Sequence, residues 1–107
     1  MRLPYLSFMV IGAAVAAQQV HAQELSDLER GRALAHQVCA ECHAVGPADA
    51  RSPNVLAPRF EAVAATPGMT GAALNAFLHT SHRNMPNLIL SADQTNGIIA
   101  YILSLKK

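Results

Sequence analysis

Cys39-Ala40-Glu41-Cys42-His43 is the stretch of the sequence that decides the fold. On a helical turn, the two thiols of this stretch project to the same side, and the imidazole follows directly after the second thiol. The thiols can add to the two vinyl groups on one edge of a haem, and the imidazole can then bind the iron. Because this C-x-x-C-H pattern is typical of covalent haem attachment, it predicts one haem c bound through Cys39 and Cys42, with His43 as an iron ligand.

Other chemistries use two cysteines at this spacing. The simplest alternative is that the two cysteines form a disulfide or have no shared function. A thioredoxin-like redox pair should lie beside a strand-helix-strand pattern, which the sequence lacks. A zinc site would have to recruit His79 and His82, and the first of these lies 36 positions after His43, far beyond the usual spacing. The spacing therefore favours haem over these alternatives.

The second axial ligand separates an electron carrier from a haem that binds other molecules. Met85 lies in the turn Asn84-Met85-Pro86-Asn87, because proline disfavours a helical conformation in the residue before it. A thioether raises the reduction potential of haem iron. We therefore predict His43 and Met85 as the two metal ligands, although a lone methionine commonly only fills a gap in the core. The alternatives are an open distal site or one of three other side chains: Met69, His79 and His82.

The first residues form a segment of a different kind. Arg2 gives the N-terminus a positive charge, and Leu6–Ala17 is an uncharged apolar run of 12 residues. Val20-His21-Ala22 resembles an A-x-A cleavage site. Together they are typical of a secretory signal peptide. An uncleaved membrane anchor would need about 18 or more consecutive apolar residues. We expect a signal peptide at residues 1–22 and a single periplasmic domain at residues 23–107.

Composition excludes several kinds of partner. The chain has 107 residues and a formal net charge of +1, and residues 23–107 contain equal numbers of basic and acidic side chains. No basic stripe is present, so nucleic-acid binding is not expected. Once the signal peptide is removed, no stable membrane insertion is expected either.

The remaining pattern is helical throughout. Ser26-Asp27-Leu28-Glu29 and Ser91-Ala92-Asp93-Gln94 both match the capping box that opens a helix. No segment shows strand periodicity. An all-α domain follows, with four helices expected in this order: Ser26 to about Cys39, Pro58 to Thr66, Thr70 to near His82, and Ser91 to the C-terminus.

Three ordered blocks resemble the small class I bacterial cytochromes c: residues 31–46, residues 84–88 and residues 98–105. The resemblance implies the cytochrome c fold, with about four helices around one covalently attached haem. It implies that the first and last helices cross at nearly right angles, with Gly31 packed against Tyr101. It also implies a hydrogen bond from the second ring nitrogen of His43 to a backbone carbonyl, for which Pro53 or Pro58 is expected.

Periodicity and the same resemblance suggest an apolar haem surround made of seven residues: Leu34, Phe60, Leu74, Phe77, Leu88, Ile98 and Tyr101. With both axial positions filled, the iron cannot bind a substrate, so one-electron transfer is expected and enzymatic activity is not. Partners would be transient redox proteins such as a dehydrogenase, an oxidase or another cytochrome. The open alternatives are a haem subunit or sensor with an open distal site, and an electron-transfer subunit of a periplasmic dehydrogenase.

Overall fold

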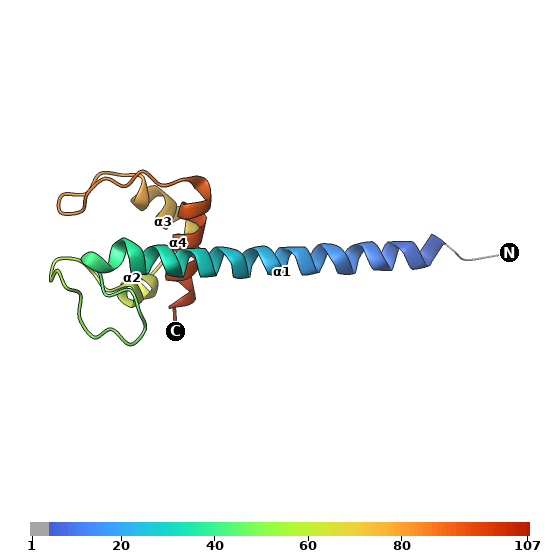
Figure 1. The fold of residues 1–107 in the computed structure, drawn as a ribbon, viewed down its shortest axis with the longest axis horizontal. Helices are drawn as coiled ribbons and strands as arrows, with labels where there is room; N and C mark the ends of the chain where they lie inside the picture. Colours follow the sequence, from blue (N-terminus) through green and yellow to red (C-terminus); the bar gives the residue numbers. More distant parts are fainter. Residues whose placement is uncertain (1–4) are drawn as a thin grey trace.

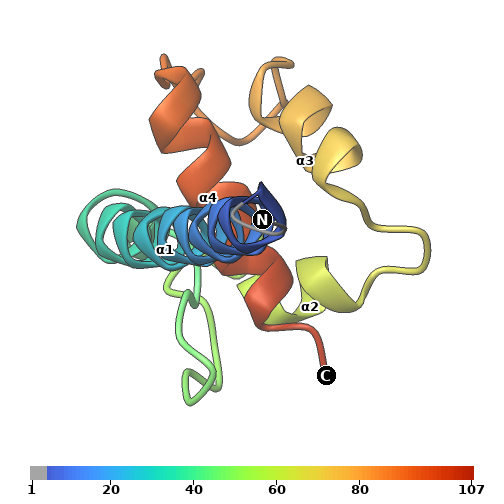
Figure 2. The same cartoon turned by 90° about the vertical axis from the view of Figure 1, so that its right-hand side faces the viewer.

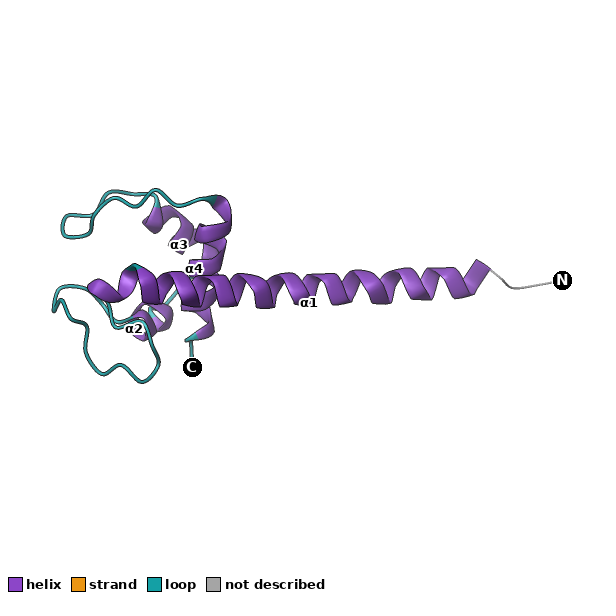
Figure 3. Cartoon of the chain, viewed as in Figure 1, coloured by secondary structure: helices purple, strands orange, loops and turns teal. Residues whose placement is uncertain are grey.

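The computed structural model describes the backbone of residues 5–107 and the side chains of residues 15–107. Arg2, the positive start of the predicted signal peptide, lies outside the described residues. Within the described part all regular elements are helical (Figure 3), which confirms the all-α prediction. The elements are α1 (Tyr5–Gln37), a 3-10 turn η1 (Cys39–Glu41), α2 (Phe60–Ala65), α3 (Gly71–Leu78) and α4 (Ala92–Ser104).

The first helix is longer than predicted. α1 runs from Tyr5 to Gln37 without a break, and its N-terminal half projects away from the rest of the molecule (Figure 1). The prediction that a capping box at Ser26 opens this helix is therefore wrong. The eight residues before Ser26 include neither proline nor glycine, so the backbone amides around Ser26 are satisfied by the preceding turn and need no cap. In the described part of the chain, no helix combines the length and apolar character needed to cross a membrane.

α4 crosses α1, and the two helices approach most closely at a pair of glycines (Figures 1 and 2). A Cβ atom added to Gly31 would lie 1.7 Å from the carbonyl oxygen of Gly97. The three atoms nearest to this position belong to the backbone of Gly97 and Ile98, and the expected packing of Gly31 against Tyr101 stays a prediction. The contact is between two backbones, and any side chain at Gly31 would force the helices apart.

Short helices and caps complete the fold. Thr70 caps α3 by accepting a hydrogen bond from the Ala73 amide, and Ser91 and Gln94 form the predicted capping box of α4. α3 ends at Leu78, short of the predicted end near His82. The reason is local, since Nδ1 of His79 binds the carbonyl of Asn75 and so satisfies one of the last helical carbonyls.

The hydrophobic core lies where α2, α3 and the C-terminal half of α1 pack around α4 (Figure 2). It consists mainly of eight buried residues: Ala35, Val45, Phe60, Ala64, Leu74, Ile98, Tyr101 and Ile102. This core is small, as expected for a domain of this length. Its open side faces the loops that follow η1 and α3.

Candidate haem-binding site

A largely apolar cavity of about 420 Å³ opens beside the core. Its walls come from η1, from the loop before α2, from α2, α3 and α4, and from the segment that follows α3. All four predicted site residues line it: Cys39, Cys42, His43 and Met85. Residues far apart in sequence therefore meet at one cavity. Its volume is within the range of about 300–1,000 Å³ that is usual for cofactor and ligand sites.

The two cysteines lie on a tight turn at one end of the cavity. The carbonyl of Cys39 accepts hydrogen bonds from the amides of Cys42 at 3.2 Å and His43 at 2.9 Å. This turn carries both half-buried thiols to the cavity wall, and they are not joined to each other. Both sulfur atoms are therefore available for bonds to a third group.

His43 is held in one tautomer. Its Nδ1 lies 2.7 Å from the carbonyl oxygen of Pro58. A carbonyl can only accept, so Nδ1 carries the proton and donates it, which leaves Nε2 with a free lone pair. This is the arrangement by which proteins orient a metal-binding histidine. Of the two carbonyls expected for this bond, the structure selects Pro58 over Pro53.

Several hydrogen bonds fix the loop that carries the Pro58 carbonyl. The Cys42 carbonyl accepts from the Asn54 amide at 3.1 Å, and the Ala44 carbonyl accepts from the Phe60 amide at 2.9 Å. Deeper in the core, the buried hydroxyl of Tyr101 donates to the Val45 carbonyl at 2.7 Å. The His43 side of the cavity is thus tied to both α2 and α4.

The surroundings of the cysteines do not fit the competing chemistries. Burial raises the pKa of the Cys39 thiol, whereas redox-active and zinc-binding cysteines need the thiolate. Among the residues that the structure describes, no group of three or more His, Cys, Asp or Glu side chains could hold a metal ion. Neither a thioredoxin-like pair nor a zinc site receives support.

Met85 is half-buried and lines the same cavity from the segment after α3, and Figure 1 shows this segment and the loop after η1 on opposite sides of the C-terminal end of α1. Of the three alternative ligands, Met69 and His79 do not line the cavity, whereas His82 does. The donor set therefore fits a haem: two thiols, one imidazole with a free Nε2, and a thioether within an apolar enclosure.

Five of the seven predicted surround residues line the cavity, and two do not. Leu34 packs at the edge of the core and Tyr101 within it, so their expected role is corrected. Apolar lining residues that the prediction missed are Val38, Leu56, Val63, Leu78 and Ile102. Ile102 lies on the apolar stripe of α4, but periodicity alone does not tell which part of a stripe faces the cavity and which part faces the core.

Comparisons with known proteins agree with this geometry. No curated protein and no solved structure gives a significant match. The family model described as Cytochrome c matches residues 28–106, which is well over half of the chain and includes every element that forms the cavity. The chain therefore belongs to the cytochrome c family of haem-binding electron-transfer proteins.

Proposed function

We propose that this chain is an exported one-electron carrier with a single haem c. Cys39 and Cys42 attach the haem through thioether bonds, and His43 and Met85 bind its iron. With His43 and Met85 both bound to the iron, no position would remain for a substrate, so the chain would act as a carrier and not as an enzyme. The observation that carries this proposal is the His43–Pro58 hydrogen bond, which leaves the Nε2 lone pair free on a ring that lines the same cavity as both cysteines and Met85.

The bound haem supplies reversible one-electron transfer. The protein residues hold its surroundings constant between the two oxidation states. The Pro58 carbonyl accepts a hydrogen bond from the Nδ1–H group of His43 and so fixes the orientation of the ring. Phe60 packs against the His43 ring, with ring centroids 5.4 Å apart. The Tyr101 ring in turn packs against Phe60, with centroids 6.4 Å apart. These aromatic contacts restrict rotation of the imidazole, which reduces reorganisation when the iron changes its charge.

Export is the second part of the proposal. Residues 1–22 act as a signal peptide, cleavage follows Ala22, and the mature protein works in the periplasm. Every side chain from Val15 to Ser26 is exposed, and the first half-buried residues are Asp27 and Leu28. Residues 15–22 therefore contribute nothing to the core, and a chain that begins at Gln23 would retain every element around the cavity.

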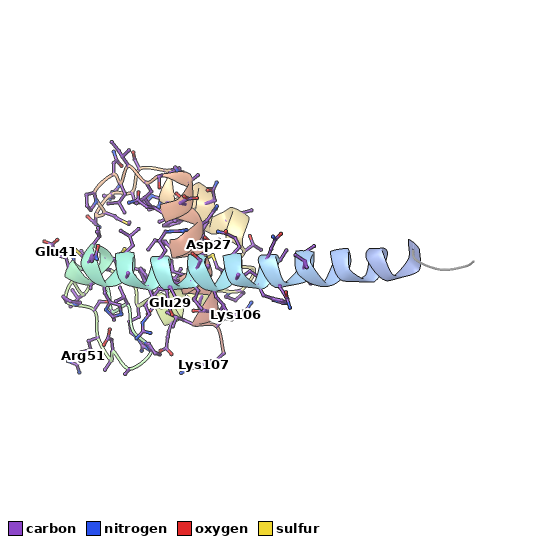
Figure 4. All side chains as sticks on the ribbon, turned by 45° about the vertical axis from the view of Figure 1, so that its right-hand side comes forward. Asp27, Glu29, Glu41, Arg51, Lys106 and Lys107 are labelled. Atoms are coloured by element: carbon purple, nitrogen blue, oxygen red, sulfur yellow. The ribbon has the colours of Figure 1, made fainter. Side chains whose placement is uncertain are left out.

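Transient redox partners are proposed to dock at the apolar rim of the cavity. Leu56 and Phe77 line the cavity and are 68% and 61% exposed. Figure 4 labels three acidic and three basic side chains, so both signs occur among the described residues: Asp27, Glu29 and Glu41, and Arg51, Lys106 and Lys107. Association rates should therefore depend weakly on salt, and a steep fall with ionic strength would contradict this docking mode.

The experiment is expression of the full chain in a bacterium with periplasmic haem-attachment machinery. The periplasmic protein should begin at Gln23, carry the mass of one haem and stay red after acid-acetone extraction. Its oxidised spectrum should be low-spin with a far-red sulfur-to-iron band. The matched control is the Cys39→Ser/Cys42→Ser variant, which should be colourless. A colourless wild-type protein, or thiols that are free or joined to each other, would refute the proposal.

A further inference from the structure

His82 is a polar side chain of the cavity wall that the proposed carrier does not use. It lines the cavity together with His43 and Met85. Its Nε2 atom is shielded from solvent and has no hydrogen-bond partner among the residues that the structure describes. Buried polar atoms in proteins nearly always have a partner, so an unpaired imidazole nitrogen at a cofactor cavity calls for a functional explanation.

The backbone places His82 beside Met85. The two residues form an isolated antiparallel bridge across a two-residue turn, with the Met85 amide 3.5 Å from the His82 carbonyl oxygen. Side chains of directly opposed residues in an antiparallel pair lie on the same face. The His82 ring also meets the Phe77 ring edge-on, with centroids 3.8 Å apart, and Phe77 itself lines the cavity. His82 is therefore held at the cavity next to the proposed distal ligand.

We propose that His82 is a reserve ligand of the haem iron, which binds through Nε2 when the Met85 sulfur leaves. This inference rests on the proposed function. One iron–sulfur bond breaks and one iron–nitrogen bond forms; a thioether and an imidazole that carries its proton on Nδ1 both bind as neutral donors, so the exchange transfers neither an electron nor a proton. Imidazole and thioether are both established haem ligands. The chain also offers a matched control in His79, whose Nδ1 binds the Asn75 carbonyl and which does not line the cavity.

The test uses the matured holoprotein and the visible and electron paramagnetic resonance spectra of its oxidised form. Met85→Leu, which keeps an apolar side chain of similar size, should lose the far-red band but stay low-spin. Met85→Leu/His82→Ala should be high-spin, whereas Met85→Leu/His79→Ala should match Met85→Leu. The inference is overturned if Met85→Leu is already high-spin, or if it stays low-spin after His82 is removed.

A second measurement needs no change at Met85. Mild urea should detach the sulfur in the oxidised wild-type protein and give a low-spin species without the far-red band. In His82→Ala, which should keep the far-red band before urea is added, the same urea concentration should give a high-spin species. An identical low-spin species in both proteins would overturn the inference. Failure of the proposed function itself looks different, since the wild-type protein would then carry no covalent haem.

Discussion

The two walls of the cavity are held in different ways. The wall that contains His43 is tied by hydrogen bonds to Pro58 and, through Val45, to Tyr101 on α4. The opposite wall, residues 81–90, has one described backbone hydrogen bond of its own, between Met85 and His82 at 3.5 Å. Hydrogen bonds within the protein fix the conformation of the first wall. The conformation of the second wall depends more on contacts with a group bound in the cavity.

This contrast has a physical consequence for a haem protein. An imidazole fixed in tautomer and orientation stays on the iron, because leaving it would break several other contacts. A thioether on a weakly bonded segment can leave at low cost, because few buried contacts and backbone hydrogen bonds oppose local opening. Ligand exchange is therefore expected at Met85 and not at His43.

The largest expected effect compares the two proposed iron ligands directly. His43→Ala should abolish stable haem binding and leave little coloured protein. Met85→Leu should keep the covalent haem and lower the reduction potential by on the order of 0.1 V, a fraction of the range of about 0.8 V that axial ligands span. Haem content and redox titration of both variants measure the difference. Equal loss of haem from the two variants would contradict the proposed difference between the two walls.

The next effect concerns the helix crossing that supports the His43 wall. Gly31→Ala should destabilise the holoprotein by about 3 kcal/mol or more, because the new Cβ would overlap the Gly97 backbone. Gly71→Ala is the matched control, since its Cβ would meet only Ile99 at an ordinary 3.4 Å. Urea unfolding of both variants gives the two free energies. Similar losses would show that the glycine contact is not tight.

A smaller effect is expected from the hydrogen bond between α4 and the His43 wall. Tyr101→Phe leaves the buried Val45 carbonyl without its partner and should cost about 1–3 kcal/mol of stability. The far-red band should persist, because Met85 is on the opposite wall. Denaturant titration and the oxidised spectrum test the two statements separately. Loss of the band with unchanged stability would mean that the walls are coupled.

Helix caps give a weaker effect at the end of the Met85 wall. Ser91→Ala removes the capping box of α4 and should cost about 1 kcal/mol. In the full chain Ser26→Ala should change stability by less than about 0.5 kcal/mol, because Ser26 lies inside α1 and is exposed. Thermal unfolding of the two variants checks this order. An equal cost at Ser26 would indicate that α1 begins there in solution.

The smallest effect is on pH dependence near the His43 wall. The ammonium group of Lys107, whose Nζ lies 2.9 Å from Oε1 of Glu61, lowers the pKa of Glu61 from its ordinary value of 4.5, and the Arg59 guanidinium lowers it further. A lowered pKa in the folded state contributes stability that is complete above the unfolded value and is lost as the pH falls through the folded value. Below about pH 4.5, Glu61→Gln should therefore lose less stability on acidification than the wild-type protein. Unfolding curves at several acidic pH values test this, and parallel curves would contradict it.

Prediction from the sequence succeeded where chemistry is local. The turn at Cys39–His43, the caps at Thr70 and Ser91 and the loop position of Met85 each depend on a few neighbouring residues. Prediction failed where a helix boundary depends on which of several nearby groups satisfies the backbone. Ser26 begins a sequence that matches a capping box, but α1 continues through it. α3 ends before His82, because the His79 side chain binds the Asn75 carbonyl and closes the helix earlier.

The sequence by itself therefore determined the cofactor motif, the helical class and the candidate ligands, because these depend on residue type and spacing. Only the tertiary structure decided that Gly31 meets Gly97, that Pro58 holds His43, and that His82 and not His79 lines the cavity with Met85. Each of these contacts joins segments whose approach is set by how the whole core packs. Local periodicity and spacing carry no information about that packing.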